Sequence, residues 1–190
     1  MKETLPVSPA EPVASQDAKP QGIGMAVAFD WGLAVELFLL PLFPSFSQML
    51  ASMKQFHLSS GTAMLVAILL LWPIAICFAL LGEAVRSGRN WARRIQIVFN
   101  ALGFLGGITL AINVVQTVRT GDYLSIVPAF ILFVISPLIA WRLSRPVTAR
   151  WFKTVSSTNA RRRHSGLWLV FIALWSIIGG VLVALGAVMH

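Results

Sequence analysis

The sequence has little charge of either sign and is especially poor in acidic residues. Charged side chains make up 12% of its 190 residues, which is about half the share found in typical soluble domains. A chain this poor in charge cannot cover a globule of its size with polar surface, so an ordinary soluble enzyme is excluded. A disordered chain is excluded as well, because disordered chains are polar whereas 57% of this sequence is hydrophobic.

The sequence also lacks the residue sets that carry catalysis. Its one cysteine, Cys77, cannot form an internal disulfide, and we interpret it as a small residue in apolar surroundings. The three histidines lie far apart without metal-ligand spacing, and neither a nucleophile motif nor a phosphate-binding loop occurs. We therefore expect no enzymatic activity, no metal and no cofactor.

Long uncharged runs explain the apolar composition. The four runs are residues 62–82, 95–118, 123–141 and 165–189. Each is close to the roughly 20 residues that a helix needs to cross a hydrocarbon core. Four buried helices of a soluble bundle would need polar helices to cover them, and none remain. The sequence predicts an all-α fold, a polytopic membrane helix bundle, with spans at about 62–84, 95–118, 123–141 and 166–189.

The region before these runs is harder to interpret. Residues 1–22 combine four prolines with charges of both signs, which is typical of a disordered tail. Residues 31–53 are largely apolar but contain Pro41 and Pro44, which oppose a straight helix. They form either a kinked first span or a re-entrant segment. We favour five transmembrane helices, the alternative being four plus a re-entrant segment.

The basic residues predict the orientation. The net charge is +8, and eleven of the fifteen lysines and arginines lie in two loops, 85–94 and 142–164. Short loops rich in lysine and arginine face the cytoplasm. With five spans, the N-terminus is then cytoplasmic and the C-terminus outside. We interpret the charge as contact with anionic lipid, not with nucleic acid. The side chains expected at the lipid interface are Arg86, Arg89, Trp91, Arg93, Arg94, Arg150, Trp151, Arg161, Arg162 and Arg163.

One loop carries a recognisable string. Gly88-Arg89-Asn90-Trp91-Ala92-Arg93 follows the second predicted span, and Arg150-Trp151-Phe152 follows the fourth. Both resemble segments of small bacterial multi-pass (four-helix-type) membrane proteins of unknown function with a GRNWAR-like loop. The resemblance covers roughly residues 25–152, and the fifth span departs from the four-helix pattern. It implies a location in the bacterial inner (cell) membrane and no activity.

Two spans carry stripes of small and polar residues. On the third span Gln96, Asn100, Gly103, Gly107 and Ala111 share one face, and on the fifth span Ser176, Gly180 and Ala184 do. Small residues let helices approach closely, and amide side chains form hydrogen bonds across the contact. We expect these spans to pack closely, with each other or with a partner copy. A homodimer interface and a polar substrate path are the alternatives for the third span.

Intramembrane charge is the usual pointer to function. Glu36 is the candidate, in a polar site with Gln96, Asn100 and Asn113. Alternatively Glu36 lies near the cytoplasmic interface, where we also place Asp30. Glu83 precedes the basic loop and is expected to pair with Arg86, three residues later.

These features favour a small integral membrane protein that acts as a non-catalytic accessory or interaction protein through helix–helix association. The expected partners are anionic lipids and either a second copy or a membrane partner protein. The alternative is a subunit of a homo-oligomeric transporter or channel for a small solute or ion. In that case Glu36, Asn100 and Asn113, together with spans kinked by proline, would line the path.

Overall fold

A computed structural model describes residues 20, 22–52, 59–119 and 126–188, and every regular element among them is helical. Five helical segments are long and apolar enough to cross a membrane, which confirms the predicted all-α bundle with five spans. These segments are Ile23–Leu42, Ser60–Arg86, Asn90–Val114, Ile126–Ser144 and Leu167–Gly186. The predicted disordered tail lies almost entirely outside the described residues.

The first span differs from the prediction at both ends. Helix α1 covers Ile23–Leu39 and is followed by a single 3₁₀ turn, η1 (Leu40–Leu42). Helix α2 (Pro44–Ser52) is then a separate short helix. A kinked helix over 31–53 is therefore wrong. The prolines end the helix instead of bending it: Pro41 has no N–H to continue the ladder, and Phe43, just before Pro44, is extended at φ −82° and ψ 125°.

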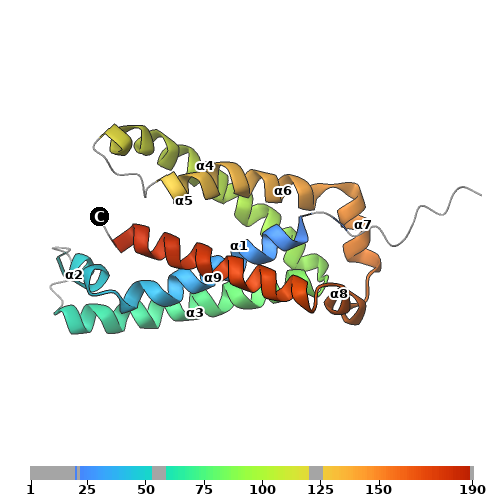
Figure 1. The fold of residues 1–190 in the computed structure, drawn as a ribbon, viewed down its shortest axis with the longest axis horizontal. Helices are drawn as coiled ribbons and strands as arrows, with labels where there is room; N and C mark the ends of the chain where they lie inside the picture. The colour runs from blue at the N-terminus through green and yellow to red at the C-terminus, as the bar shows by residue number, and fades with distance from the viewer. Residues whose placement is uncertain (1–19, 21, 53–58, 120–125, 189–190) are drawn as a thin grey trace, which may run out of the picture.

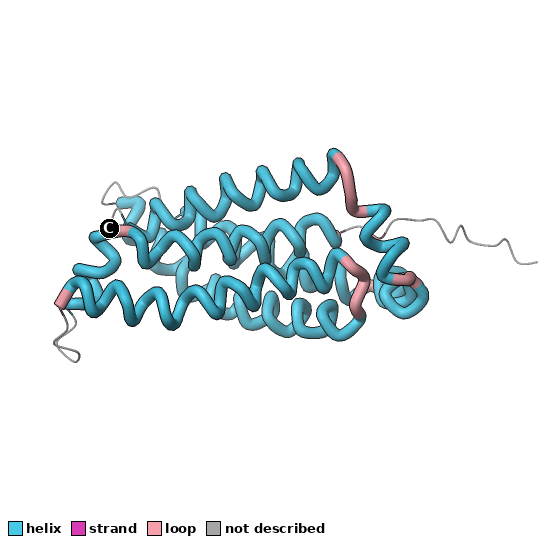
Figure 2. The backbone as a smooth tube through the Cα atoms, turned by 90° about the horizontal axis from the view of Figure 1, so that it is seen from below, coloured by secondary structure: helices cyan, strands magenta, loops and turns pink. Residues whose placement is uncertain are grey.

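The spans form two groups (Figure 1). Helix α1 packs between α3 (Ser60–Arg86) and α9 (Leu167–Val188), and α4 (Asn90–Arg119) packs along the fourth span. Helices α3 and α4 are joined by a tight turn and diverge from it, so they make few contacts with each other. Figure 2 shows the long helices running side by side, with the short helices at their ends.

The fourth span is not a regular α-helix. It consists of α5 (Ile126–Phe130), a π-helical turn η2 (Ile131–Ile135) and α6 (Ser136–Ser144). The backbone N–H of Ser136 bonds to the carbonyl of Ile131, five residues earlier. Pro137 follows directly and has no N–H to donate. The π turn thus lies where the proline interrupts the ordinary ladder.

Both basic loops meet at one end of the bundle, which we call the basic end. Helices α7 (Pro146–Thr154) and α8 (Ser157–Arg163) cross this end and pack on the turn after α3. Gly88 in that turn has φ +76°, and a Cβ there would lie 2.7 Å from Val155 Cγ1 and 3.2 Å from the Ala160 Cβ. Glycine therefore permits both the turn and the contact. We call this assembly of the two loops the basic cap.

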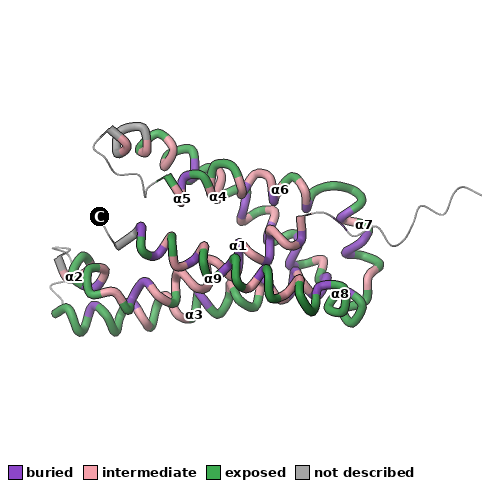
Figure 3. The backbone as a smooth tube through the Cα atoms, viewed as in Figure 1, coloured by how far each residue is buried: buried purple, intermediate pink, exposed green. Residues whose placement is uncertain are grey.

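The apolar core also lies toward the basic end (Figure 3). Its largest fully buried apolar side chains are Ile23, Val27, Val85, Ile139 and Leu143. Much of the remaining surface of the spans consists of exposed large apolar side chains. That arrangement suits helices whose outer faces meet lipid instead of water.

Candidate functional site: a buried polar junction

Three polar side chains are buried between the two helix groups. Asp30 lies on α1, and Gln96 and Asn100 lie one turn apart on α4; each has an exposed fraction of 0%. We call these three residues the polar junction. Polar groups in the interior of a membrane bundle are expensive to bury, so they mark either a specific helix contact or a functional site.

The hydrogen bonds of the junction link α1 to α4. Gln96 Nε2 donates to Asp30 Oδ1 over 2.8 Å, and Asn100 Nδ2 donates to the backbone carbonyl of Gln96 over 2.8 Å. Both amide nitrogens are thereby engaged. The oxygens Asp30 Oδ2, Gln96 Oε1 and Asn100 Oδ1 are buried and accept no hydrogen bond from the described residues. Three buried acceptor oxygens of the junction thus remain without a donor among the described residues.

Asp30 also has no cationic partner among the described residues. The ion pairs in that part of the chain are those of Glu83 with Arg86 and Arg161. Arg93 lies one turn before Gln96, but its guanidinium donates to the Leu143 carbonyl over 2.9 Å and to Asn90 Oδ1 over 3.0 Å. The carboxyl of Asp30 is therefore buried without a neighbouring positive side chain.

Glycines allow the helices to close around the junction. A Cβ on Gly82 of α3 would lie 2.7 Å from the Trp31 ring and 3.1 Å from the Asp30 Cβ. On α4, a Cβ on Gly103 would lie 3.5 Å from Ser136 Oγ, itself fully buried at the start of α6. Small residues at these points let α1 and α6 approach their neighbours closely.

Of the predicted polar site, the structure brings Gln96 and Asn100 together but with a different carboxylate. Glu36 is half-buried in the part of α1 remote from the basic end. Six residues separate it from Asp30, which turns it about 120° away on the helix. Asp30 is buried inside the bundle, where Gly82 makes room for it. Asn113 is exposed, more than three turns beyond Asn100.

The two stripes of small residues both form close helix contacts, but not with each other. A Cβ on Gly107 would lie 2.7 Å from the carbonyl carbon of Leu132, so this glycine packs on the π turn η2. A Cβ on Gly180 would lie 2.5 Å from the backbone oxygen of Gly32, so α9 packs on α1. Both spans therefore pack closely, as predicted, but not with each other, because each uses its stripe on a different helix of the bundle.

The remaining stripe residues follow the same division. Ser176 and Ala184 are buried on α9, and Ser176 Oγ donates to the Ile172 carbonyl of its own helix over 2.7 Å. Ala111, near the outer end of the stripe on α4, is only half-buried. Contacts of the stripe on α4 are thus concentrated at Gly103 and Gly107.

Several residues expected at the lipid interface instead hold the basic cap together. Arg86 Nε pairs with Glu83 Oε2 over 2.6 Å, which confirms that predicted pair, and Arg86 also donates to the His164 carbonyl over 3.0 Å. Arg161 reaches the same carboxylate over 3.1 Å. The lipid-facing role predicted for Arg93 and Trp151 is wrong, since they are only 9% and 8% exposed.

Trp151 is part of a buried aromatic cluster inside the cap. Its ring centroid lies 5.0 Å from that of Phe152 and 5.9 Å from that of His164, which in turn lies 4.6 Å from Trp168. The predicted interface residues that are exposed at the basic end are Arg89, Trp91, Arg94, Arg150, Arg161, Arg162 and Arg163.

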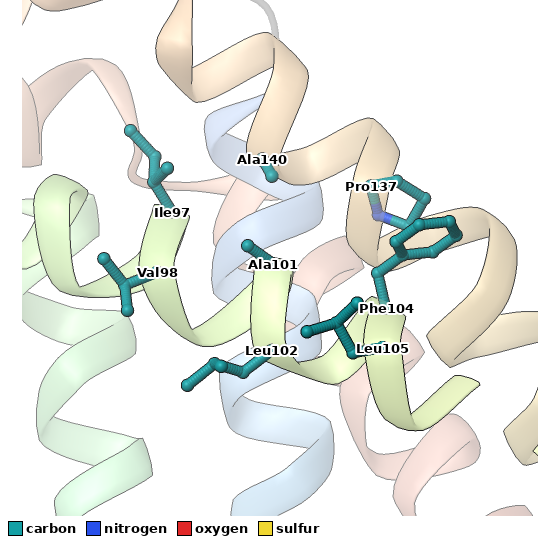
Figure 4. A pocket seen from close by; sticks show the side chains of 8 residues that line it. All are labelled: Ile97, Val98, Ala101, Leu102, Phe104, Leu105, Pro137 and Ala140. Carbon is teal, nitrogen blue, oxygen red and sulfur yellow. The ribbon is translucent and has the colours of Figure 1, made fainter. Parts of the chain in front are cut away.

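Two apolar grooves open on the sides of the bundle. The larger, of about 520 Å³, lies between α4 and α6 (Figure 4) and is lined by Ile97, Val98, Ala101, Leu102, Phe104, Leu105, Pro137 and Ala140. The smaller, of about 290 Å³, lies between α1, α3 and α9 and is lined by Trp31, Ala34, Val35, Ala79, Ala173, Ser176 and Ile177. Neither has the convergent polar groups of a site for a polar substrate.

Comparisons with known proteins do not indicate a function. No protein-family model, curated protein or solved structure matches the chain. Among the described residues, no group of three or more His, Cys, Asp or Glu side chains is placed to hold a metal ion. The candidate functional features are therefore the polar junction, the basic cap and the surface of α4.

Proposed function

We propose that the protein is a non-catalytic accessory protein of the bacterial inner membrane, which acts by binding another transmembrane helix through α4. One observation carries this proposal: α4 has a second small and polar face that the described part of the bundle leaves uncovered. Gly106 is exposed, and a Cβ placed on it would have no neighbouring atom within 4 Å. Thr109 beside it is exposed as well.

This face continues the larger groove. Leu102 and Leu105 line the groove and are 61% and 59% exposed. They lie one turn before Gly106 and Thr109, so the four residues form one strip along α4. We call it the association strip. Glycine and threonine at exposed positions of a span favour contact with a helix, because a helix backbone fits closely over them.

A pair of glycine substitutions tests this role. We expect the full-length protein, purified in mild detergent, to carry a second copy of itself or a partner membrane protein. Gly106→Leu should strongly reduce the amount of this bound partner, because the new side chain blocks the association strip. Gly179→Leu is the matched control, since its position on α9 also has no atom within 4 Å of an added Cβ. Copy number is measured by light scattering. A monomer without a partner, or equal loss in both variants, would contradict the proposal.

The arrangement of the ends supports an orientation with the N-terminus in the cytoplasm and the C-terminus outside. The loops 85–94 and 142–164, rich in arginine, meet at the basic end, where α1 also begins. Helix α9 runs from this end to the opposite one. Under the positive-inside rule the basic end is cytoplasmic. Exposed arginines there, such as Arg89 and Arg150, would contact anionic lipid.

A second candidate function, a subunit of a homo-oligomeric transporter or channel, is favoured by the polar junction beside an interrupted span. The three side chains of the junction are fully buried, and the π turn and Pro137 interrupt the span that packs on α4. Such breaks are common where transporters bind ions. If this function holds, proteoliposomes should show cation flux that Asp30→Asn abolishes. Flux indistinguishable from empty vesicles would rule it out.

A further inference from the structure

The polar junction contains a carboxylate, Asp30, but no positive charge to balance it. Asp30 is fully buried, and among the described residues no lysine or arginine pairs with it. Burying an isolated carboxylate in a medium of low dielectric is prohibitive unless a proton or a cation neutralises it. The choice between the two follows from the atoms around it.

The count of acceptors favours a cation over a proton. Asp30 Oδ2, Gln96 Oε1 and Asn100 Oδ1 all remain without a hydrogen bond, and all three accept. A proton on Asp30 would create one O–H donor, which satisfies one of the two amide oxygens and leaves the other unpaired. A hard cation binds carboxylate and amide oxygens alike and satisfies all three.

We propose that the polar junction binds one small monovalent cation, for which Na⁺ is the probe. Asp30 supplies the charge, and Gln96 and Asn100 supply neutral oxygens, because their amide nitrogens are already engaged. One carboxylate balances one monovalent charge, whereas a divalent ion would leave a net charge buried in the bundle. The bound ion joins α1 to α4 and thereby fastens the two helix groups together. This site lies inside the bundle and is independent of the association strip.

The first measurement is the thermal unfolding of the full-length protein in mild detergent, followed by tryptophan fluorescence. NaCl is titrated against choline chloride at constant ionic strength. Because the ion binds only the folded protein, Na⁺ in large excess over its dissociation constant should raise the midpoint by about 5 °C, and the midpoint should keep rising with the logarithm of the Na⁺ concentration. Equal midpoints in the two salts, or a midpoint that responds to pH and not to Na⁺, would overturn the proposal in favour of a protonated Asp30.

Variants assign the effect to the junction. Asp30→Asn should abolish both the shift and the binding of radioactive Na⁺, while Glu36→Gln, the matched change on the same helix, should leave both intact. Asn100→Leu keeps the carboxylate and should raise the Na⁺ concentration needed for a given shift of the midpoint by about tenfold or more. This variant decides the matter if Asp30→Asn does not fold. A Na⁺ effect that persists unchanged in these junction variants would show that the ion binds elsewhere.

Discussion

Neighbouring residues of α4 face different surroundings, which makes them sensitive probes of the packing. Gly106 and Gly107 are adjacent in sequence, yet only Gly107 lies against the backbone of the π turn. The periodicity of the sequence identifies Gly103 and Gly107 as packing residues. It cannot show that Gly106 stays uncovered, because that depends on where α6 lies.

We expect Gly107→Ala to destabilise the protein and Gly106→Ala to leave it unchanged or slightly more stable. The added methyl at Gly107 would lie 2.7 Å from the Leu132 backbone, and such overpacking costs about 1–3 kcal/mol. At Gly106 the added methyl contacts no other part of the described bundle, and alanine stabilises the helix by about 0.5–1 kcal/mol relative to glycine. Thermal unfolding in detergent measures both, and equal destabilisation would contradict the packing of η2 on α4.

Arg93 and Arg94 form a second such pair. Arg93 is buried and donates to the Leu143 carbonyl, whereas Arg94 is exposed. Since a buried hydrogen bond from a charged group contributes about 1.5–3 kcal/mol, Arg93→Ala should lower the midpoint of unfolding clearly. Arg94→Ala should change the stability by about 0.5 kcal/mol or less. Similar values for the two variants would argue against the contact between α4 and α6 at this end.

At the scale of elements, the basic cap is an assembled unit and not a loose lipid-binding loop. Residues 142–164 are rich in arginine, and Val147, Trp151 and Val155 within them follow the four-residue spacing of one helical face. In the structure both Val147 and Trp151 lie on α7, but Trp151 is buried whereas Val147 is 54% exposed. Composition alone could not distinguish a tryptophan in lipid headgroups from one packed against Phe152 and His164.

Removal of the indole tests the cap. Trp151→Ala should destabilise the protein by about 3–5 kcal/mol, the range for a buried large aromatic residue. Trp141→Ala is the control, because that ring is 55% exposed. Protease protection of the segment between α6 and α9 reports the cap directly. It should be lost in Trp151→Ala and kept in Trp141→Ala, and protection retained in both would contradict a packed cap.

At the scale of the whole molecule, the sequence predicted the number of spans and the existence of their polar contacts. Long uncharged runs determine where a helix must lie in lipid, and this signal is strong. Which helices pack together is much harder to predict from the sequence. The stripes on α4 and α9 show that each packs closely, but any facing helix satisfies such a stripe. Asp30 was missed for a related reason: its burial depends on Gly82 of another helix.

The orientation can be tested on the complete chain. A reporter fused at residue 10 should read cytoplasmic, and a reporter after His190 should read outside, because an odd number of spans separates them. Replacement of Arg89, Arg94 and Arg150 by glutamate, at exposed positions of the basic end, should reduce the fraction of correctly oriented chains. Two termini on the same side would contradict five spans, and an outside N-terminus would reverse the proposed orientation.

The π turn also changes the phase of the fourth span. A π turn closes hydrogen bonds over five residues instead of four, so it takes up one residue more than the α-helix would. The chain before Ile131 and the chain after Ile135 therefore follow two helical registers, offset by about 100°. Deletion of a single residue within η2 would restore one continuous register. With Val134 as the deleted residue, α5 would rotate relative to α6 and the contact of Gly107 would separate from that of Gly103, while Leu132, Phe133 and Ser136, which these glycines contact, are all kept.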